Sequence, residues 1–128
     1  MKFFLDTHTF LWLVDGDARL STVAAQAIAD QHNELFLSVA SIWELAIKSS
    51  LGKITLRDPL DVFVTTWTDA YQIQVMAILA RHAIAVATLP FNHSDPFDRL
   101  LIAQAMTENM TLLSSDRRLH DYGVQIAW

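Results

Sequence analysis

Lys2-Phe3-Phe4-Leu5-Asp6 and Thr111-Leu112-Leu113-Ser114-Ser115-Asp116 are the two stretches that decide the fold of this 128-residue chain. Each is a short apolar run with the length and composition of a buried β-strand, and each ends in an aspartate. Strand-like and helix-like segments alternate between them, an order typical of a parallel sheet covered by helices on both faces. The sequence therefore predicts an α/β fold in which Asp6 and Asp116 follow two strands.

The rest of the chain continues this alternation. Further strands are expected at residues 34–38, 71–75 and 124–128, which gives a central, mostly parallel sheet of four to five strands. Helices are expected at residues 9–14, 22–31, 41–50, 58–69, 76–87 and 95–109. No repeat, linker or low-complexity stretch interrupts the pattern, so residues 1–128 are expected to form one domain.

Composition narrows the classes of function. No stretch approaches the roughly 20 apolar residues of a membrane span, and the N-terminal stretch does not resemble a secretory signal. The absence of cysteine excludes disulfides and thiolate metal sites and fits a cytoplasmic protein. The net charge of −5 argues against a general nucleic-acid binder, whose surface would be basic. It does not argue against a nuclease whose acidic side chains bind metal.

Four acidic residues have comparable positions along the chain. Asp6 and Asp116 end strands, whereas Glu44 and Asp98 lie near the starts of helices, and these ends meet at one edge of a parallel sheet. Carboxylates held close together repel and raise one another's pKa, and a divalent cation removes that repulsion. Mg²⁺ prefers oxygen ligands, and it can orient a phosphodiester and activate a water molecule. The sequence thus indicates a metal-dependent phosphodiesterase.

Each acid also has a local explanation. Asp6 and Asp116 could be ordinary turn residues after strands. The S-I-W-E sequence at 41–44 fits a capping box, in which the glutamate bonds back to the helix N-terminus. The D-P-F-D sequence at 95–98 fits a helix start with an aspartate N-cap, and D-P-L-D at 58–61 has the same form with no acidic strand end nearby in sequence. The four acids therefore gain their significance from their order along the whole chain.

Taken in order, these stretches resemble the PIN-domain family, and within it the VapC-like toxins of bacterial toxin–antitoxin pairs. The resemblance covers essentially the whole chain, and it depends on all the pieces occurring at the right separations. The matching pieces are Phe4–Trp12, Ser38–Lys48 followed by Gly52-Lys53, Leu89-Pro90, His93–Ala105 and Leu112–Asp116.

The resemblance implies a three-layer α/β/α PIN-like fold and a Mg²⁺- or Mn²⁺-dependent endoribonuclease. It also implies a homodimer that a cognate antitoxin inhibits. The metal-site acids of the family map onto Asp6, Glu44, Asp98 and Asp116, and none is missing, so an active enzyme is expected. The family often has two adjacent histidines before the D-P-F-D-R stretch, whereas this chain has Asn92-His93.

Several neighbouring residues have two possible roles. Thr7 and Ser115 could hydrogen-bond the metal-site acids or be ordinary hydroxyls at strand ends. Asp95 could join the metal ligands or serve only as an N-cap. Arg99 could hold an acid in place or contact phosphate, or be a surface or salt-bridged arginine, and His93 could be a catalytic base or a hydrogen-bonding loop residue.

Trp12 and Trp43 are expected in the core, while Arg117 and Arg118 could contact an RNA backbone or be solvated. Two rival functions remain open at this stage. One is a catalytically silent PIN-like module that binds a protein partner through an apolar surface, for which the candidates are Trp67, Phe63 and Tyr71. The other is a metal-dependent nuclease that acts on DNA.

Overall fold

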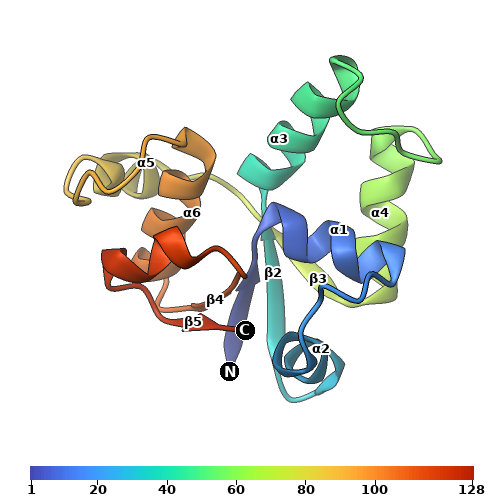
Figure 1. Cartoon of the computed structure of the whole chain (residues 1–128), viewed down its shortest axis with the longest axis horizontal. Coiled ribbons are helices and arrows are strands. Elements are labelled where there is room, and N and C mark those ends of the chain that lie inside the picture. The colour runs from blue at the N-terminus through green and yellow to red at the C-terminus, as the bar shows by residue number, and fades with distance from the viewer.

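A five-stranded, fully parallel sheet runs through the centre of the computed structural model, which describes residues 1–128 (Figure 1). The strand order is β3-β2-β1-β4-β5, with every neighbouring pair parallel. The α/β prediction is confirmed. The strands are β1 (Lys2–Leu5), β2 (Glu34–Ser38), β3 (Ile73–Met76), β4 (Thr111–Leu113) and β5 (Ile126–Ala127).

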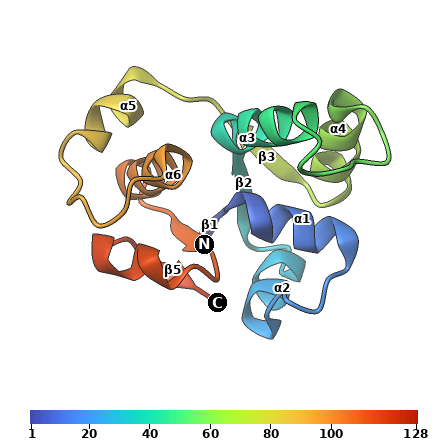
Figure 2. The ribbon, with the colours of Figure 1, turned by 45° about the horizontal axis from the view of Figure 1, so that its top comes forward.

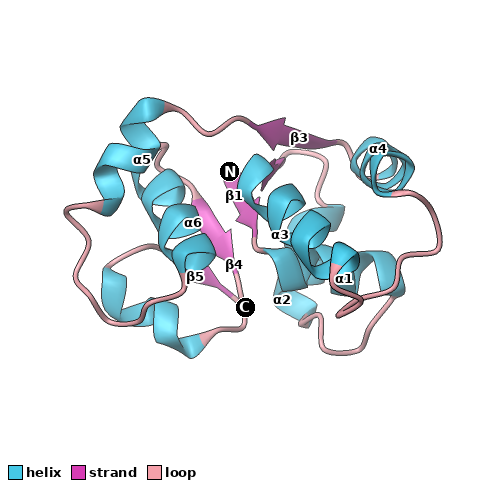
Figure 3. Ribbon diagram, turned by 90° about the horizontal axis from the view of Figure 1, so that it is seen from above, coloured by secondary structure: helices cyan, strands magenta, loops and turns pink.

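Helices cover both faces of the sheet, which confirms the three-layer arrangement (Figure 3). One layer contains α1 (Thr7–Asp15), α2 (Thr22–Ala29), α3 (Val39–Ser50) and α4 (Leu60–Ala70). The other contains α5 (Ala80–Val86), α6 (Pro96–Thr107) and the 3₁₀ helix η1 (Arg117–Tyr122). No helix in the structure combines the length and the hydropathy needed to span a membrane.

Alternate side chains along the strands pack into two separate hydrophobic cores, one on each face of the sheet. Phe3 and Leu5 of β1 pack with residues from α1 to α4, while Phe4 between them packs with α6 and η1. Phe4 and Leu5 are completely buried, and each such side chain contributes about 2 kcal/mol through the hydrophobic effect. The apolar runs are continuous because both faces of a parallel sheet are covered.

The sheet reverses its strand order beside β1. The chain passes from β1 to β2 and β3 on one side, and then returns to β4 on the other. The backbone amide of Asp6 and the hydroxyl of Thr9 both donate to the carbonyl of Leu113, over 3.3 and 2.8 Å. These bonds fix the end of β1 against the end of β4, at the point in an open α/β sheet where ligands usually bind.

The start of α3 differs from the prediction. This helix begins at Val39, and the Ser38 hydroxyl caps it by accepting from the amide of Ala40. Glu44 therefore lies in the second turn, and the predicted capping box at residues 41–44 is wrong. The reason is that β2 runs directly into α3, so the last strand residue becomes the cap. Ser41 is buried instead, and its hydroxyl has no hydrogen-bond partner.

Other element boundaries also shift. The first helix begins at Thr7, two residues early, because Asp6 caps it through the amide of Thr9. The third strand begins two residues late, because α4 extends through Ala70 and Gln72 then reverses the chain with φ of +54°. Phe63, which was expected at the surface, is 6% exposed and belongs to the core.

Candidate functional site

The four acids named from the sequence lie at the carboxyl edge of the sheet. They come from four different elements: Asp6 after β1, Glu44 on α3, Asp98 on α6 and Asp116 after β4. Helices α3 and α6 stand on opposite sides of this edge (Figure 2). A cleft of about 510 Å³ separates them, and its lining residues include Glu44 on one wall, Asp95 on the other, and Arg118.

Asp98 is the electrostatic centre of the cluster. Burial raises the pKa of its carboxyl, and the negative charges of Asp95, Asp116 and Asp6 raise it further, to about 6. The imidazole of His93 acts in the opposite direction, because its Nε2 lies 3.3 Å from Oδ2 of Asp98. Four carboxyl groups are therefore close enough to repel one another, as the sequence predicted for three of them, and Asp95 joins them.

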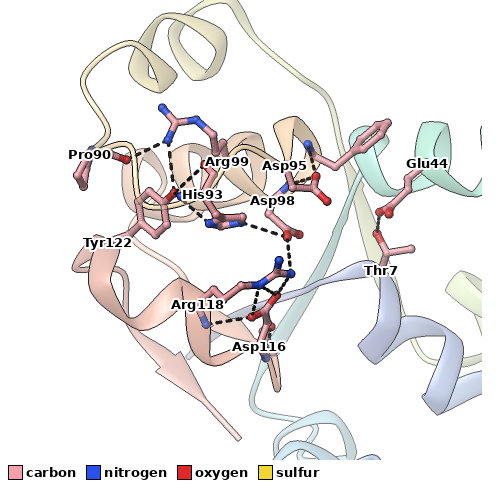
Figure 4. A network of polar contacts seen from close by, with 12 residues as sticks. Thr7, Glu44, Pro90, His93, Asp95, Asp98, Arg99, Asp116, Arg118 and Tyr122 are labelled. Atoms are coloured by element: carbon pink, nitrogen blue, oxygen red, sulfur yellow. Dashed lines mark hydrogen bonds and ion pairs between the residues drawn. The ribbon is translucent and has the colours of Figure 1, made fainter.

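Asp116 is neutralised within the protein. The guanidinium of Arg118 donates hydrogen bonds to both carboxylate oxygens of Asp116, with Nη2 2.6 Å from Oδ2. This pairing holds the pKa of Asp116 below its usual range. Nη2 of Arg118 also lies 3.8 Å from Asp98, so one arginine bridges two acids (Figure 4). The Arg118 side chain remains 63% exposed. Arg118 is thus paired with two acids of the cluster and remains accessible to solvent.

Glu44 faces the cluster from the α3 wall. Its Oε1 accepts a 2.6 Å hydrogen bond from the Thr7 hydroxyl, and its Oε2 lies 2.8 Å from the amine of Lys48 (Figure 4). The prediction that Thr7 could hydrogen-bond an acid of the cluster is confirmed. Asp6 is 7% exposed, and only its Oδ1 is used for capping α1.

Asp95 caps α6, as predicted. Its Oδ1 accepts from the amides of Phe97 and Asp98 over 2.9 and 3.2 Å, and Pro96 takes the first helical position. Asp95 also lines the cleft, and it is the neighbouring charge that raises the pKa of Asp98 most. The same residue therefore orders the helix start and adds negative charge to the site.

His93 is held from behind by Tyr122. The tyrosine hydroxyl accepts from the backbone amide of His93 and lies 3.0 Å from its Nδ1, while the Nε2 faces Asp98. The interpretation of His93 as a hydrogen-bonding loop residue is confirmed. Its imidazole orientation, and with it the contact to Asp98, is fixed by η1.

Arg99 neither holds an acid of the cluster nor lies at the surface or in a salt bridge. Its guanidinium is buried without an acidic partner and donates to the carbonyls of Pro90 and Val86, and to Tyr122. It also lies against the ring of Phe91, 4.8 Å from the centroid. The side chain turns away from the acids because this loop needs donors for its unpaired carbonyls.

Two further expectations have different outcomes. Of the two roles considered for Ser115, the structure shows the ordinary hydroxyl, which is exposed and makes no hydrogen bond; the hydroxyl that holds the acidic loop belongs to Ser114, which accepts from the amide of Asp116. The strand ends at Leu113, so the serine that points inward is one position earlier than expected. Trp43 was expected in the core but is 57% exposed, while Trp12 is half-buried.

The chemistry of this donor set fits a hard divalent cation. All the candidate ligands are carboxylate oxygens, and the raised pKa of Asp98 reports a repulsion that such an ion would relieve. With the side chains as they lie, no three acidic or histidine groups converge closely enough to hold a metal ion. The Arg118 guanidinium lies between Asp98 and Asp116 and supplies the positive charge that faces both acids.

Comparison with known proteins identifies the family. A family model described as PIN domain matches residues 3–125. The chain belongs to the PIN domain family. It is 32% identical over 121 residues to Ribonuclease VapC22 of Mycobacterium tuberculosis, which covers 92% of this chain and 89% of the relative.

Solved structures show the same PIN fold. VapBC2 from Rickettsia felis, bound to a DNA fragment from their promoter, superposes with a TM-score of 0.72 at 13% identity and covers 99% of this chain and 98% of that one. DNA-bound VapBC from Salmonella typhimurium gives a TM-score of 0.72 at 14% identity, with coverages of 99% and 97%. At these identities the likeness supports the fold alone.

The cleft of this PIN domain also contains residues to which the sequence gave no role. Lys48 and Lys53 line it, and Lys48 could have been noticed because it stands four residues after Glu44, where ion pairs form along a helix. Nothing in the local sequence marks Tyr122, which reaches His93 from 29 positions away.

Proposed function

We propose that this PIN domain is a Mg²⁺- or Mn²⁺-dependent endoribonuclease and the toxin of a toxin–antitoxin pair. The observation that carries the proposal is the gathering of acids from four elements at the switch point of the sheet, with Asp98 held at a pKa of about 6 by burial and its neighbours. The 32% identity to a protein named a ribonuclease supports RNA as the substrate.

Asp6, Asp98, Asp116 and Glu44 would hold the ion, with Asp95 beside them. A bound divalent cation would polarise the scissile phosphate and activate a water molecule for in-line attack. The protein supplies the rigidity that this chemistry needs. Thr7 orients Glu44, and Asp6 is fixed by capping α1.

Arg118 would exchange one anionic partner for another. In the structure it neutralises Asp116 and approaches Asp98. With an ion held by these acids, the exposed Arg118 guanidinium would be available to a phosphate oxygen, for which its planar set of donors is suited. A phosphate contact of Arg118 corresponds to one of the two roles that the sequence left open for Arg117 and Arg118, contact with an RNA backbone.

The proposed setting is the cytoplasm, with a cognate antitoxin as inhibitor and a homodimer as the active assembly. The VapBC complexes with the same fold support the antitoxin. Light scattering on the purified protein tests the dimer, and coexpression with the product of the neighbouring reading frame tests the antitoxin. A monomer, or a failure of the two products to copurify, would contradict the respective part.

The activity is tested with purified protein and matched RNA and DNA strands, with Mg²⁺, Mn²⁺ or EDTA present. We expect cleavage of RNA with either metal and none with EDTA. Asp6→Asn should remove the activity while the protein keeps its fold, because an amide keeps the cap of α1 but loses the ligand charge. Cleavage that persists in EDTA would contradict the metal site, and cleavage of DNA alone would contradict the substrate.

A further inference from the structure

Trp43 is a large aromatic residue whose side chain is mostly exposed to solvent. It precedes Glu44 on α3, and 57% of it is accessible. Its ring packs edge-to-face against Phe97 at a centroid distance of 5.2 Å. Phe97 belongs to the first turn of α6 and lines the cleft. Trp43 therefore extends an aromatic surface from Phe97, a lining residue of the cleft, to the exposed side of α3.

One lysine at this side of the cleft is unpaired. Lys48 is paired with Glu44, whereas Lys53, which follows α3 and also lines the cleft, is exposed with no carboxylate within ion-pair distance. In a chain with a net charge of −5, Lys53 is a free positive charge at the cleft that Phe97 also lines. An aromatic surface for bases with lysines for the backbone is the usual composition of a groove that binds single-stranded nucleic acid.

We propose that Trp43, supported by Phe97, is a stacking platform for an unpaired base of the RNA substrate, with Lys53 near the adjoining phosphates. The proposal rests on the ribonuclease function proposed above and assigns a base-binding residue to its substrate site. A base in a duplex is already stacked on both faces, so it cannot cover the ring of Trp43. Because Phe97 both contacts Trp43 and lines the cleft, a base on the platform would lie at the rim of the acidic cleft.

A peptide from a partner protein could also cover this pair of rings. Two features favour the nucleic acid: Lys53 is exposed at the cleft with no acidic partner, and the ring that supports Trp43 belongs to Phe97, which lines the cleft and precedes Asp98. The two occupants make different demands on Trp43. A base needs a flat aromatic ring at this position, whereas a peptide contact needs only apolar bulk.

The kinetic test compares Trp43→Ala, Trp43→Phe and Trp43→Leu in the full chain, on a short mixed-sequence single-stranded RNA and on its duplex. We expect Trp43→Ala to raise KM for the single strand about tenfold, equivalent to about 1.4 kcal/mol, and to change kcat by less than about twofold. Trp43→Phe should recover most of the affinity, and Trp43→Leu should not. The wild type should prefer the single strand, and Trp43→Ala should lose this preference.

Binding without cleavage provides a second measurement. In EDTA, the single-stranded RNA should quench tryptophan fluorescence of the wild type, and Trp43→Phe should abolish this quenching. Trp67→Phe is the matched control, because Trp67 stacks on Tyr71 away from the cleft and its loss should leave the RNA-dependent quenching in place. Thermal melting and light scattering verify that each variant is folded and keeps the oligomeric state of the wild type.

The outcomes separate this proposal from the function that it rests on. If the wild type cleaves RNA but Trp43→Ala has unchanged KM, or Trp43→Leu is as good as Trp43→Phe, the platform is wrong and the ribonuclease stands. If the wild type cleaves no RNA, the function fails, and the fluorescence titration alone decides the platform. If Trp43→Ala keeps RNA binding but loses the antitoxin or the dimer, the surface is a protein interface and the proposal is overturned.

Discussion

Two segments of this chain have the same sequence form, D-P-x-D, and only one of them becomes part of a site. In Asp95–Asp98 the first aspartate caps α6 with two hydrogen bonds, and the last is half-buried among other acids. In Asp58–Asp61 the helix begins at Leu60 with no side-chain cap, and both aspartates are exposed. The motif encodes a helix start at most.

Tertiary structure creates the difference. Arg99, which follows the first segment, is buried and anchors the loop before α6 by donating to Pro90. Val62 in the corresponding place is 46% exposed and anchors nothing. The first helix start is therefore held rigidly at the sheet edge, where other acids lie. The two segments form a natural pair for experiments, since the same substitution should have different effects in each.

The largest difference should appear in catalysis. Asp98→Asn should lower RNA cleavage at least about a hundredfold, because losing one ligand of a catalytic ion removes several kcal/mol of transition-state stabilisation. Asp61→Asn, the matched control, should leave the rate within about twofold. Initial rates with excess Mg²⁺ measure both. Full activity in Asp98→Asn would exclude Asp98 from the site.

Stability should change in the opposite direction. The folded-state pKa of Asp98, about 6, lies above its unfolded value, so the folded protein holds this proton more tightly. The preferential protonation of Asp98 in the folded state therefore stabilises the fold fully below about pH 4, near the unfolded pKa. This stabilisation is lost as the pH rises through about 6, the folded pKa. At pH 7.5 in EDTA, Asp98→Asn should be more stable than the wild type by about 2 to 3 kcal/mol.

Urea unfolding at pH 4.5 and pH 7.5 measures this gain, which should be much smaller at the lower pH. Asp61→Asn should change stability by no more than about 0.5 kcal/mol at either pH, since it is an exposed residue. Equal stability of Asp98→Asn and the wild type at pH 7.5 would show that the acids do not repel as the structure indicates. A gain in stability when Asp98 loses its charge would indicate that the neighbouring acids destabilise the fold, as expected for a site whose charges a bound cation would offset.

The sequence predicted the sheet because buried strands give strong local signals, whereas the four acids were selected by their order along the whole chain. Phe3-Phe4-Leu5 and Leu112-Leu113 read as buried strands since a parallel sheet is covered on both faces. Helix starts were less certain, because a cap depends on where the preceding strand ends; Ser38 took the role expected of Ser41.

The support around the acids was not predictable. For Arg99 the sequence left open a contact with an acid or phosphate and a surface or salt-bridged position, and only the folded loop reveals the carbonyls to which it donates. Tyr122 lies within hydrogen-bonding distance of His93 although 29 positions separate them in the sequence. Trp43 lies in an apolar helical stretch that would suit a core residue equally well, yet it is exposed. These roles arise from contacts between distant segments, which single-sequence periodicity does not contain.

The smallest predicted effect concerns the other aspartate of each segment. Asn is as good an N-cap as Asp, so Asp95→Asn should keep the start of α6 while removing the charge that raises the pKa of Asp98 most. The Asp98 pKa should therefore fall toward its ordinary value, by roughly half a unit to one unit. Titration of the Asp98 carboxyl by ¹³C NMR in EDTA measures this fall, and Asp58→Asn, which lies far from the cleft acids, should leave the value unchanged. An unaltered Asp98 pKa in Asp95→Asn would mean that burial and the strand-end acids alone set it, and that Asp95, like Asp58, does no more than adjoin a helix start.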